Sequence, residues 1–500
     1  MNRGTKPSEL FFYKIFCLTA ILIITAYLSG CWGMGKTTDI TVSYIKVDKS
    51  SVELKVGEKT TVSAGAVPYS HDLPPMEWYT DNPKVATVLK GEITACGAGE
   101  TIITVSCLNV SKRIMVKVNA KKEYFVCNKE VPILAWYSIP PECTSVGRYK
   151  ELREAGFHIS FTHTSTLADA QAALKAARKT GVKNILMCNE LSSSPENVVK
   201  TVKNDPALYG YFLRDEPVIA DFPSLAEWAD RIRTLDPDHP IYLNLNPIYA
   251  GEEILGGTYE QYIREFIRQV KPTMVSFDHY PIIAGGIRSD FWQNLEIISK
   301  VAAQAGLPFG AFALSTSHDP YPIPTIASLR FQLYTDLAYG AQLLQYFTYW
   351  NPPQVVWNFH DAPIGLDGHK TEVYSLVQEM NEELQKRAAI WVGCTVISVV
   401  QAGTPSVIPK GTTLMTMLPE GVCELDTGGK GAVVSLIANG SHRYLMLVNH
   451  RIDTSFEYKI AFSVSGVKRI ENDGEIVSLQ DMMRYSFTLD KGDCAVFQLK

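Results

Sequence analysis

Two adjacent carboxylates close one apolar run of this sequence. In "LYGYFLRDEP", residues 208–217, Asp215 and Glu216 stand side by side, directly before Pro217 and the start of a helical pattern. Neighbouring carboxylates raise each other's proton affinity and burial raises it further, so one of them can stay protonated near neutral pH and act as an acid. In a regular strand the two side chains would point to opposite sides and have separate roles. In the alternative interpretation, Asp215 pairs with Arg214 or Arg330 and Glu216 acts alone.

The run that carries this pair is one of eight between residues 125 and 390, each followed by an amphipathic segment. Alternating apolar strands and amphipathic helices are typical of a parallel sheet covered by helices. Eight such units in this length predict a (β/α)8 TIM barrel rather than an open doubly wound sheet, because no glycine-rich phosphate loop is present. The expected strands begin at Pro132, His158, Lys183, Leu208, Ile241, Met274, Pro308 and Gln342.

In such barrels the chemistry lies at the carboxyl ends of the strands. The residues there supply carboxylates for acid and base work, amides for sugar hydroxyls and rings for stacking. The candidate catalytic residues are Glu216, Asp215 and Asp278, with Glu190 as a weaker candidate for a second carboxylate. His163 and His279 lack the spacing of a metal site, and no metal or cofactor is expected. The candidate substrate-binding residues are Trp136, His163, Asn189, Glu190, Arg214, Asn244, Asn246, Tyr280 and Trp350.

The central region resembles the glycoside hydrolase barrels of clan A. The resemblance rests on "RDEP", where Glu216 matches the general acid/base at the end of the fourth strand and Asp215 takes the place of an amide. It implies hydrolysis of a glycosidic bond. The seventh strand departs from the pattern, because "PFGAFALSTSHDP" has no Glu where the clan has its nucleophile, so the ordinary double displacement lacks a partner.

Three explanations of this departure remain open. In enzymes of chitinase and hexosaminidase type a 2-acetamido group of the substrate attacks, and the resemblance would give Asp215 and Tyr280 the orienting roles and Trp350 the floor of the sugar site. Alternatively, Asp278 or Asp319 serves as base or nucleophile. In the third, the barrel is a degenerate glycosidase that binds a glycan without cutting it.

The first 30 residues read as an export signal. Arg3, Lys6 and Lys14 precede the apolar run "IFCLTAILIITAYL", which ends in "LSGC". This resembles a bacterial lipoprotein signal peptide, which implies cleavage before Cys31 and lipidation of that cysteine. The resemblance implies a membrane-anchored protein of the cell envelope, of the outer membrane and either periplasmic or surface-exposed. Residues 31–39 are then a short polar tether.

Short alternating strands flank the barrel on both sides. Residues 40–120 resemble the bacterial Ig-like group 2 domain through Val56-Gly57, Trp78 and "NPKVATV", which implies a spacer or adhesive β-sandwich. Cys96 and Cys107 in this segment either form a disulfide or stay free thiols. Residues 391–500 predict a C-terminal β-sandwich, and "GSHRYLMLVNH" is similar to accessory domains that follow glycosidase barrels.

The charge balance argues against a nucleic-acid partner. Lys and Arg number 47 against 52 Asp and Glu, a formal net charge of −5. The sequence therefore predicts an oligo- or polysaccharide substrate and a membrane contact through Cys31 alone.

Overall fold

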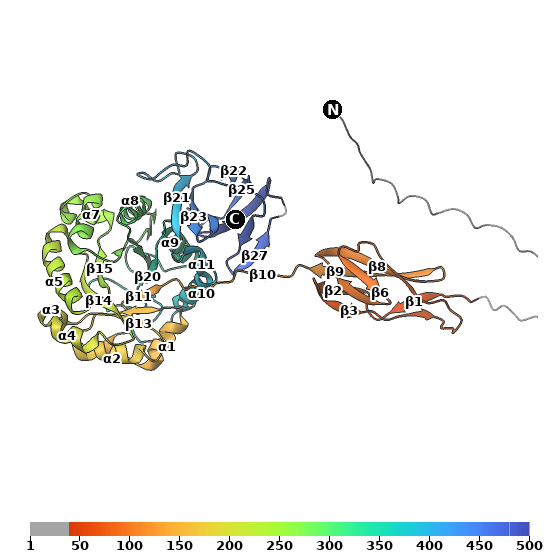
Figure 1. The fold of residues 1–500 in the computed structure, drawn as a ribbon, viewed down its shortest axis with the longest axis horizontal. Coiled ribbons are helices and arrows are strands. Elements are labelled where there is room, and N and C mark those ends of the chain that lie inside the picture. Colours follow the sequence, from red (N-terminus) through yellow and green to blue (C-terminus); the bar gives the residue numbers. More distant parts are fainter. Residues whose placement is uncertain (1–39, 480, 500) are drawn as a thin grey trace, which may run out of the picture. The chain divides into compact units, whose positions relative to one another are not determined.

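The computed structural model describes residues 40–479 and 481–499 and divides into two compact units, residues 1–121 and 122–500 (Figure 1). The predicted signal peptide, the tether and the Cys31 anchor lie outside the described residues. Among the described residues, no helix is both long enough and apolar enough to cross a membrane.

The first unit is built from short strands with alternating burial. They form a four-stranded sheet (order β2-β9-β8-β5), a three-stranded sheet (β3-β7-β6) and the pair β1-β4 around one apolar core, against which Trp78 packs. Cys96 is exposed, Cys107 is buried, and both are free thiols. The Ig-like assignment of this unit stays a prediction. Its strands are β1 Tyr44–Val47, β2 Ser51–Lys55, β3 Lys59–Thr61, β4 Ala64–Val67, β5 Glu77–Thr80, β6 Ala86–Leu89, β7 Glu92–Ala95, β8 Gly99–Cys107 and β9 Val110–Asn119.

The second unit contains a closed barrel of eight parallel strands, and all eight coincide with the apolar runs of the sequence. The predicted barrel is therefore confirmed. Strands buried on both faces need apolar residues at nearly every position, which explains why continuous runs predicted them. The strands are β11 Ile133–Trp136, β12 Ile159–Phe161, β13 Lys183–Leu186, β14 Leu208–Asp215, β15 Ile241–Leu245, β16 Val275–Phe277, β19 Phe309–Leu314 and β20 Leu343–Phe347.

Helices surround the barrel in Figure 1, and their caps are readable in the sequence. Ser145, Thr166 and Thr325 each accept a backbone N–H at a helix start. A small hairpin, β17 Ile282–Ile283 with β18 Gly286–Ile287, follows β16. The helices are α1 Val146–Glu154, α2 Leu167–Ala177, α3 Asn189–Ser193, α4 Pro195–Val202, α5 Phe222–Leu235, α6 Glu252–Leu255, α7 Tyr259–Val270, α8 Phe291–Gln304, α9 Ile326–Ala338, α10 Glu372–Lys386 and α11 Ala388–Trp391, with 3-10 turns at Pro141–Cys143, Ile219–Asp221 and Ile248–Ala250.

After α11 the chain forms a seven-stranded sheet (order β10-β27-β26-β29-β24-β23-β21) and a three-stranded sheet (β22-β25-β28). Alternate residues of β23 serve different cores: Val433 and Ile437 join the core around the barrel, while Val434 and Leu436 join the core between the two sheets. The strands are β10 Glu123–Tyr124, β21 Thr395–Ala402, β22 Val422–Asp426, β23 Ala432–Asn439, β24 His442–Asn449, β25 Phe456–Phe462, β26 Lys468–Ile470, β27 Glu475–Ser478, β28 Tyr485–Leu489 and β29 Cys494–Gln498.

Candidate active site

Three carboxylates meet at the carboxyl ends of neighbouring barrel strands. Asp215 is the last residue of β14, Glu216 follows it, and Asp278 follows β16. Asn244 of β15 lies between them, and its Nδ2 donates to Asp215 Oδ1 at 3.2 Å and to Asp278 Oδ1 at 2.8 Å. One amide thus joins two of the three carboxylates predicted from the sequence.

A buried polar chain inside the barrel fixes the orientation of Asn244. Its Oδ1 accepts a hydrogen bond from Ser276 Oγ at 3.0 Å. Ser276 Oγ in turn lies 2.8 Å from the Tyr242 hydroxyl and accepts from Gln345 Nε2 at 2.9 Å. The Tyr242 hydroxyl also donates to Gln345 Oε1. Because Ser276 donates to the amide oxygen, the amide nitrogen must face the carboxylates.

The backbone of Glu216 adopts a left-handed conformation, with φ of +46°. This conformation costs a residue with a side chain about 1–2 kcal/mol, so the surroundings must hold it. The Glu216 N–H donates to Asn244 O at 2.8 Å, and Asn246 Nδ2 donates to the Glu216 carbonyl at 2.8 Å. The Tyr262 hydroxyl donates to the Pro217 carbonyl at 2.5 Å. Asn246 therefore positions Glu216 through its backbone.

This conformation corrects one sequence-based expectation. The regular alternation of a strand would send Asp215 and Glu216 to opposite sides, but the left-handed residue ends that alternation. Both carboxylates act electrostatically on Asp278, so all three belong to one cluster. The expected pairing of Asp215 with an arginine is also absent among the described residues: Arg214 lies 3.8 Å from Asp221, and Arg330 pairs with Glu383.

Every carboxylate of the cluster has a raised pKa. Burial, followed by the charges of Glu216 and Asp215, raises the pKa of Asp278 well above its usual range. Desolvation and the charge of Glu216 raise the pKa of Asp215 to about 6, and desolvation raises the pKa of Glu216. Asp215 and Glu216 are nevertheless open to solvent, whereas Asp278 is only 8% exposed. Two accessible carboxylates next to a buried one whose charged form is disfavoured can divide acid and orienting roles.

We expect Asp278→Asn to make the protein more stable at neutral pH. An unfolded Asp has a pKa of about 3.9, and the folded pKa lies higher, so folding takes up a proton between the two values. Above pH 4, the free energy of unfolding of the wild type should fall relative to that of the variant by up to about 1.4 kcal/mol per pH unit, until the pH passes the folded pKa of Asp278. Urea unfolding of both proteins from pH 4 to pH 8 measures the difference. A stability difference that does not change with pH would show that Asp278 has an ordinary pKa.

Aromatic side chains lie beside the carboxylates. Trp136 is only 5% exposed and packs inside the barrel, with ring centroids 4.4 Å from Phe161 and 5.4 Å from Phe212. His163 is exposed and stacks on Phe212 at 5.8 Å. Tyr280 is half-buried, and the charges of Asp278, Asp215 and Glu216 all raise its pKa, after burial itself. Tyr280 is thus an aromatic residue whose pKa is affected by all three carboxylates.

Other predicted site residues have partners elsewhere. Asn189 and Glu190 belong to α3 and not to a strand end, and both oxygens of the Glu190 carboxylate accept the Leu167 N–H at the start of α2. Arg214 is an exposed partner of Asp221. Trp350 is 3% exposed, and the Arg148 guanidinium lies 5.0 Å from its ring centroid. For these four residues a contact with substrate stays a prediction.

The described residues include no group of His, Cys, Asp and Glu side chains that could hold a metal ion. His279 instead lies 3.1 Å from Asp290 and is fully buried. Sequence reasoning missed Ser276, Tyr242 and Gln345, although polar residues inside apolar runs were a signal for them.

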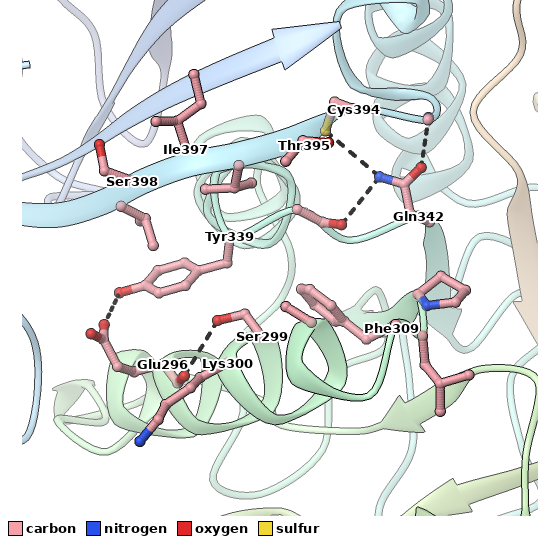
Figure 2. Close-up of a pocket in the computed structure, with 18 residues that line it drawn as sticks. Glu296, Ser299, Lys300, Phe309, Tyr339, Gln342, Cys394, Thr395, Ile397 and Ser398 are labelled. Atoms are coloured by element: carbon pink, nitrogen blue, oxygen red, sulfur yellow. Dashed lines mark hydrogen bonds between the residues drawn. The ribbon is translucent and has the colours of Figure 1, made fainter. Parts of the chain in front are cut away.

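A cavity of about 710 Å³ lies at the other end of the barrel and is unrelated to these carboxylates. Figure 2 shows its lining, in which Phe309 opens β19, Gln342 precedes β20 and Ile397 belongs to β21. Within it, the Tyr339 hydroxyl donates to Glu296 at 3.2 Å, and Gln342 contacts the Cys394 thiol at 3.8 Å. In barrels of this type the amino-terminal face serves stability, so the cavity is not the candidate active site.

No protein-family model matches the chain, and no curated protein matches it. The structural neighbours are glycoside hydrolases. A family 39 glycoside hydrolase from Bacteroides cellulosilyticus WH2 is 12% identical with a TM-score of 0.47, over 91% of this chain and 100% of the other. A putative alpha-galactosidase/melibiase from Bacteroides fragilis NCTC 9343 gives 10% identity and a TM-score of 0.42, over 91% and 98%. A beta-galactosidase from Marinomonas ef1 is 8% identical with a TM-score of 0.44, over 74% of this chain and 100% of the other. TM-scores this low carry no argument about activity.

Proposed function

We propose that this protein hydrolyses a glycosidic bond of a complex glycan, with Glu216 as the general acid/base. The supporting observation is the joined carboxylate cluster: Asp215 and Asp278 share the Asn244 amide, and Glu216 is held beside them in a left-handed conformation. A raised pKa keeps a proton available on an accessible carboxylate, which a general acid requires.

The lack of a carboxylate directly after β19 bears on which catalytic mechanism fits the site. Ser315, Thr316 and Ser317 follow this strand, so no carboxylate is available there as a nucleophile. Asp278 is only 8% exposed, and burial raises its pKa, so its charged form is disfavoured and its carboxylate is poorly placed to act as a base on water. Asp319, further along the same loop, accepts a hydrogen bond from the Asn358 amide. We therefore favour a nucleophile that the substrate brings, namely the carbonyl oxygen of a 2-acetamido group.

In this route Glu216 gives its proton to the glycosidic oxygen as the bond to the anomeric carbon breaks. The acetamido oxygen bonds to that carbon, and the ionised Asp215 accepts the acetamido N–H, which stabilises the positive charge of the cyclic intermediate. The Glu216 carboxylate then takes a proton from the water that opens the intermediate, which restores the acid. In this proposal the Tyr280 hydroxyl donates a hydrogen bond to the reacting group.

The test is a screen of the purified protein against N-acetylhexosamine-containing glycans and plant glycans, read by reducing-sugar assay and mass spectrometry. Cleavage that needs the 2-acetamido group and keeps the anomeric configuration is expected. Inversion of configuration would exclude the acetamido route. Glycan binding without any product would favour the second candidate, a glycan-binding protein on a degenerate barrel, which the lack of a β19 carboxylate also fits.

Anchoring at the cell envelope belongs to the same proposal. It rests on the sequence of residues 1–31, and a fatty acid found on the mature N-terminal peptide at Cys31 would support it.

A further inference from the structure

The loop after β20 exposes three consecutive apolar side chains. Val355 is 84% exposed, Val356 79% and Trp357 53%. Single exposed apolar residues need no explanation, but a contiguous group commonly marks a binding surface. Since the loop leaves the carboxyl end of a barrel strand, this surface lies on the same end of the barrel as the carboxylates.

The loop is held on both sides of its tip. Asn358 Oδ1 accepts the Asp319 N–H at 2.9 Å, and Gln354 Nε2 donates to the Phe359 carbonyl at 2.8 Å. His360 and Ser317 exchange two backbone hydrogen bonds of 2.9 Å. A surface fixed in this way loses little conformational entropy when a ligand binds.

Ring contacts connect Trp357 with the candidate active site. Its ring centroid lies 6.0 Å from that of His318, which lies 4.7 Å from Tyr321. Tyr321 lies 6.0 Å from Tyr280, whose pKa is affected by all three carboxylates. A row of ring contacts therefore links the exposed surface to the candidate site.

Polar groups border the exposed ring. Asn358, Asp319 and His360 are exposed, and Asn358 Nδ2 donates to Asp319 Oδ2 at 3.2 Å. An aromatic face beside planar amide and carboxylate groups suits a sugar ring, which has an apolar face and hydroxyls along its edge. We propose that Trp357, with Asn358 and Asp319, forms a second sugar-binding subsite for a distant unit of the same glycan chain.

This inference rests on the proposed function and deepens it, because it makes the substrate an oligo- or polysaccharide rather than a terminal sugar on a small aglycone. A lipid surface fits the loop less well. Membrane-inserting segments carry Lys or Arg for the anionic headgroups, whereas residues 351–361 contain neither and include Asp361.

The experiment measures sugar affinity by calorimetry in the full-length protein carrying Glu216→Gln, so that the ligand is not consumed. The probes are hexasaccharides of N-acetylglucosamine, glucose, xylose and galactose, together with the four monosaccharides. Trp357→Ala should weaken binding of the preferred hexasaccharide about tenfold, which is the order expected for one aromatic contact. Binding of the corresponding monosaccharide should stay the same. Trp357→Phe should keep most of the affinity. Ile254→Ala, which removes another exposed apolar side chain on α6, should change nothing.

Three results would overturn the subsite: equal hexasaccharide affinity with and without Trp357, no hexasaccharide binding at all, or Trp357-dependent binding to anionic phospholipid vesicles in its place. Hydrolysis by the wild type is followed separately. Hexasaccharide binding that depends on Trp357, without any cleavage by the wild type, would contradict the proposed hydrolase activity and support the subsite.

Discussion

Glu216→Gln is expected to lower kcat/KM by about 10³-fold on a natural glycan, because a positioned general acid contributes roughly 10²- to 10⁴-fold. Glutamine keeps the size of the side chain but has no proton to give. The hydrogen bonds that position residue 216 involve its backbone, from Asn244 and Asn246, so the substitution should leave the site in place. Steady-state kinetics on the substrate found by the glycan screen measures the loss.

Substrates with different leaving groups distinguish a general acid from a residue with a structural role. The dinitrophenolate of a dinitrophenyl glycoside leaves without protonation. If Glu216 is the acid, Glu216→Gln should therefore lower kcat/KM far less on this substrate than on the glycan. Glu196→Gln is the matched control, because its carboxylate pairs with Arg231 of α5 and belongs to no candidate site. We expect it to change kcat/KM less than tenfold. Equal losses on both substrates for Glu216→Gln would contradict the assignment.

The barrel and part of its candidate site could be predicted because both follow local rules. Strands buried on both faces leave apolar runs in the sequence, and the residue after each run lies at the carboxyl end of the barrel. Asp215, Glu216 and Asp278 were found in this way. The joining of Asp215 and Asp278 by Asn244 was not predicted, because the alignment of β14, β15 and β16 sets which side chains face one another.

Two features of the candidate site depend on contacts between distant segments and could not be predicted from the sequence. Glu190 follows an apolar run, but the chain has already entered α3, and the carboxylate accepts a hydrogen bond 23 residues upstream. The left-handed conformation of Glu216 could not be predicted from the sequence either. Pro217 disfavours the right-handed helical region for its predecessor, yet it does not choose between an extended and a left-handed backbone. Asn246, directly after β15, and Tyr262 of α7 make that choice.

The largest effect on stability is expected at Arg387, which is fully buried between the barrel and the seven-stranded sheet. Its guanidinium donates to the Tyr334 hydroxyl, lies 3.6 Å from Glu383 and stacks 5.3 Å from the Trp391 ring centroid. Its Nη1 also reaches the Cys494 thiol of β29 at 3.7 Å. One side chain thus links α9, α10 and the C-terminal sheet.

Arg387→Met should lower the free energy of unfolding by about 3 kcal/mol, because it removes one of the two cations that compensate the buried Glu383 carboxylate. Glu383 keeps Arg330 at 2.6 Å, so the double variant Arg387→Met/Glu383→Gln should be less destabilised than the sum of the two single changes. Arg231→Met is the control: its ion pair with Glu196 is half-exposed and should contribute at most about 1 kcal/mol. Urea unfolding followed by tryptophan fluorescence measures all four. Because Arg387 links both parts, barrel and sheet should unfold in one transition, and a separate transition for the sheet, or equal losses for Arg387→Met and Arg231→Met, would contradict this role.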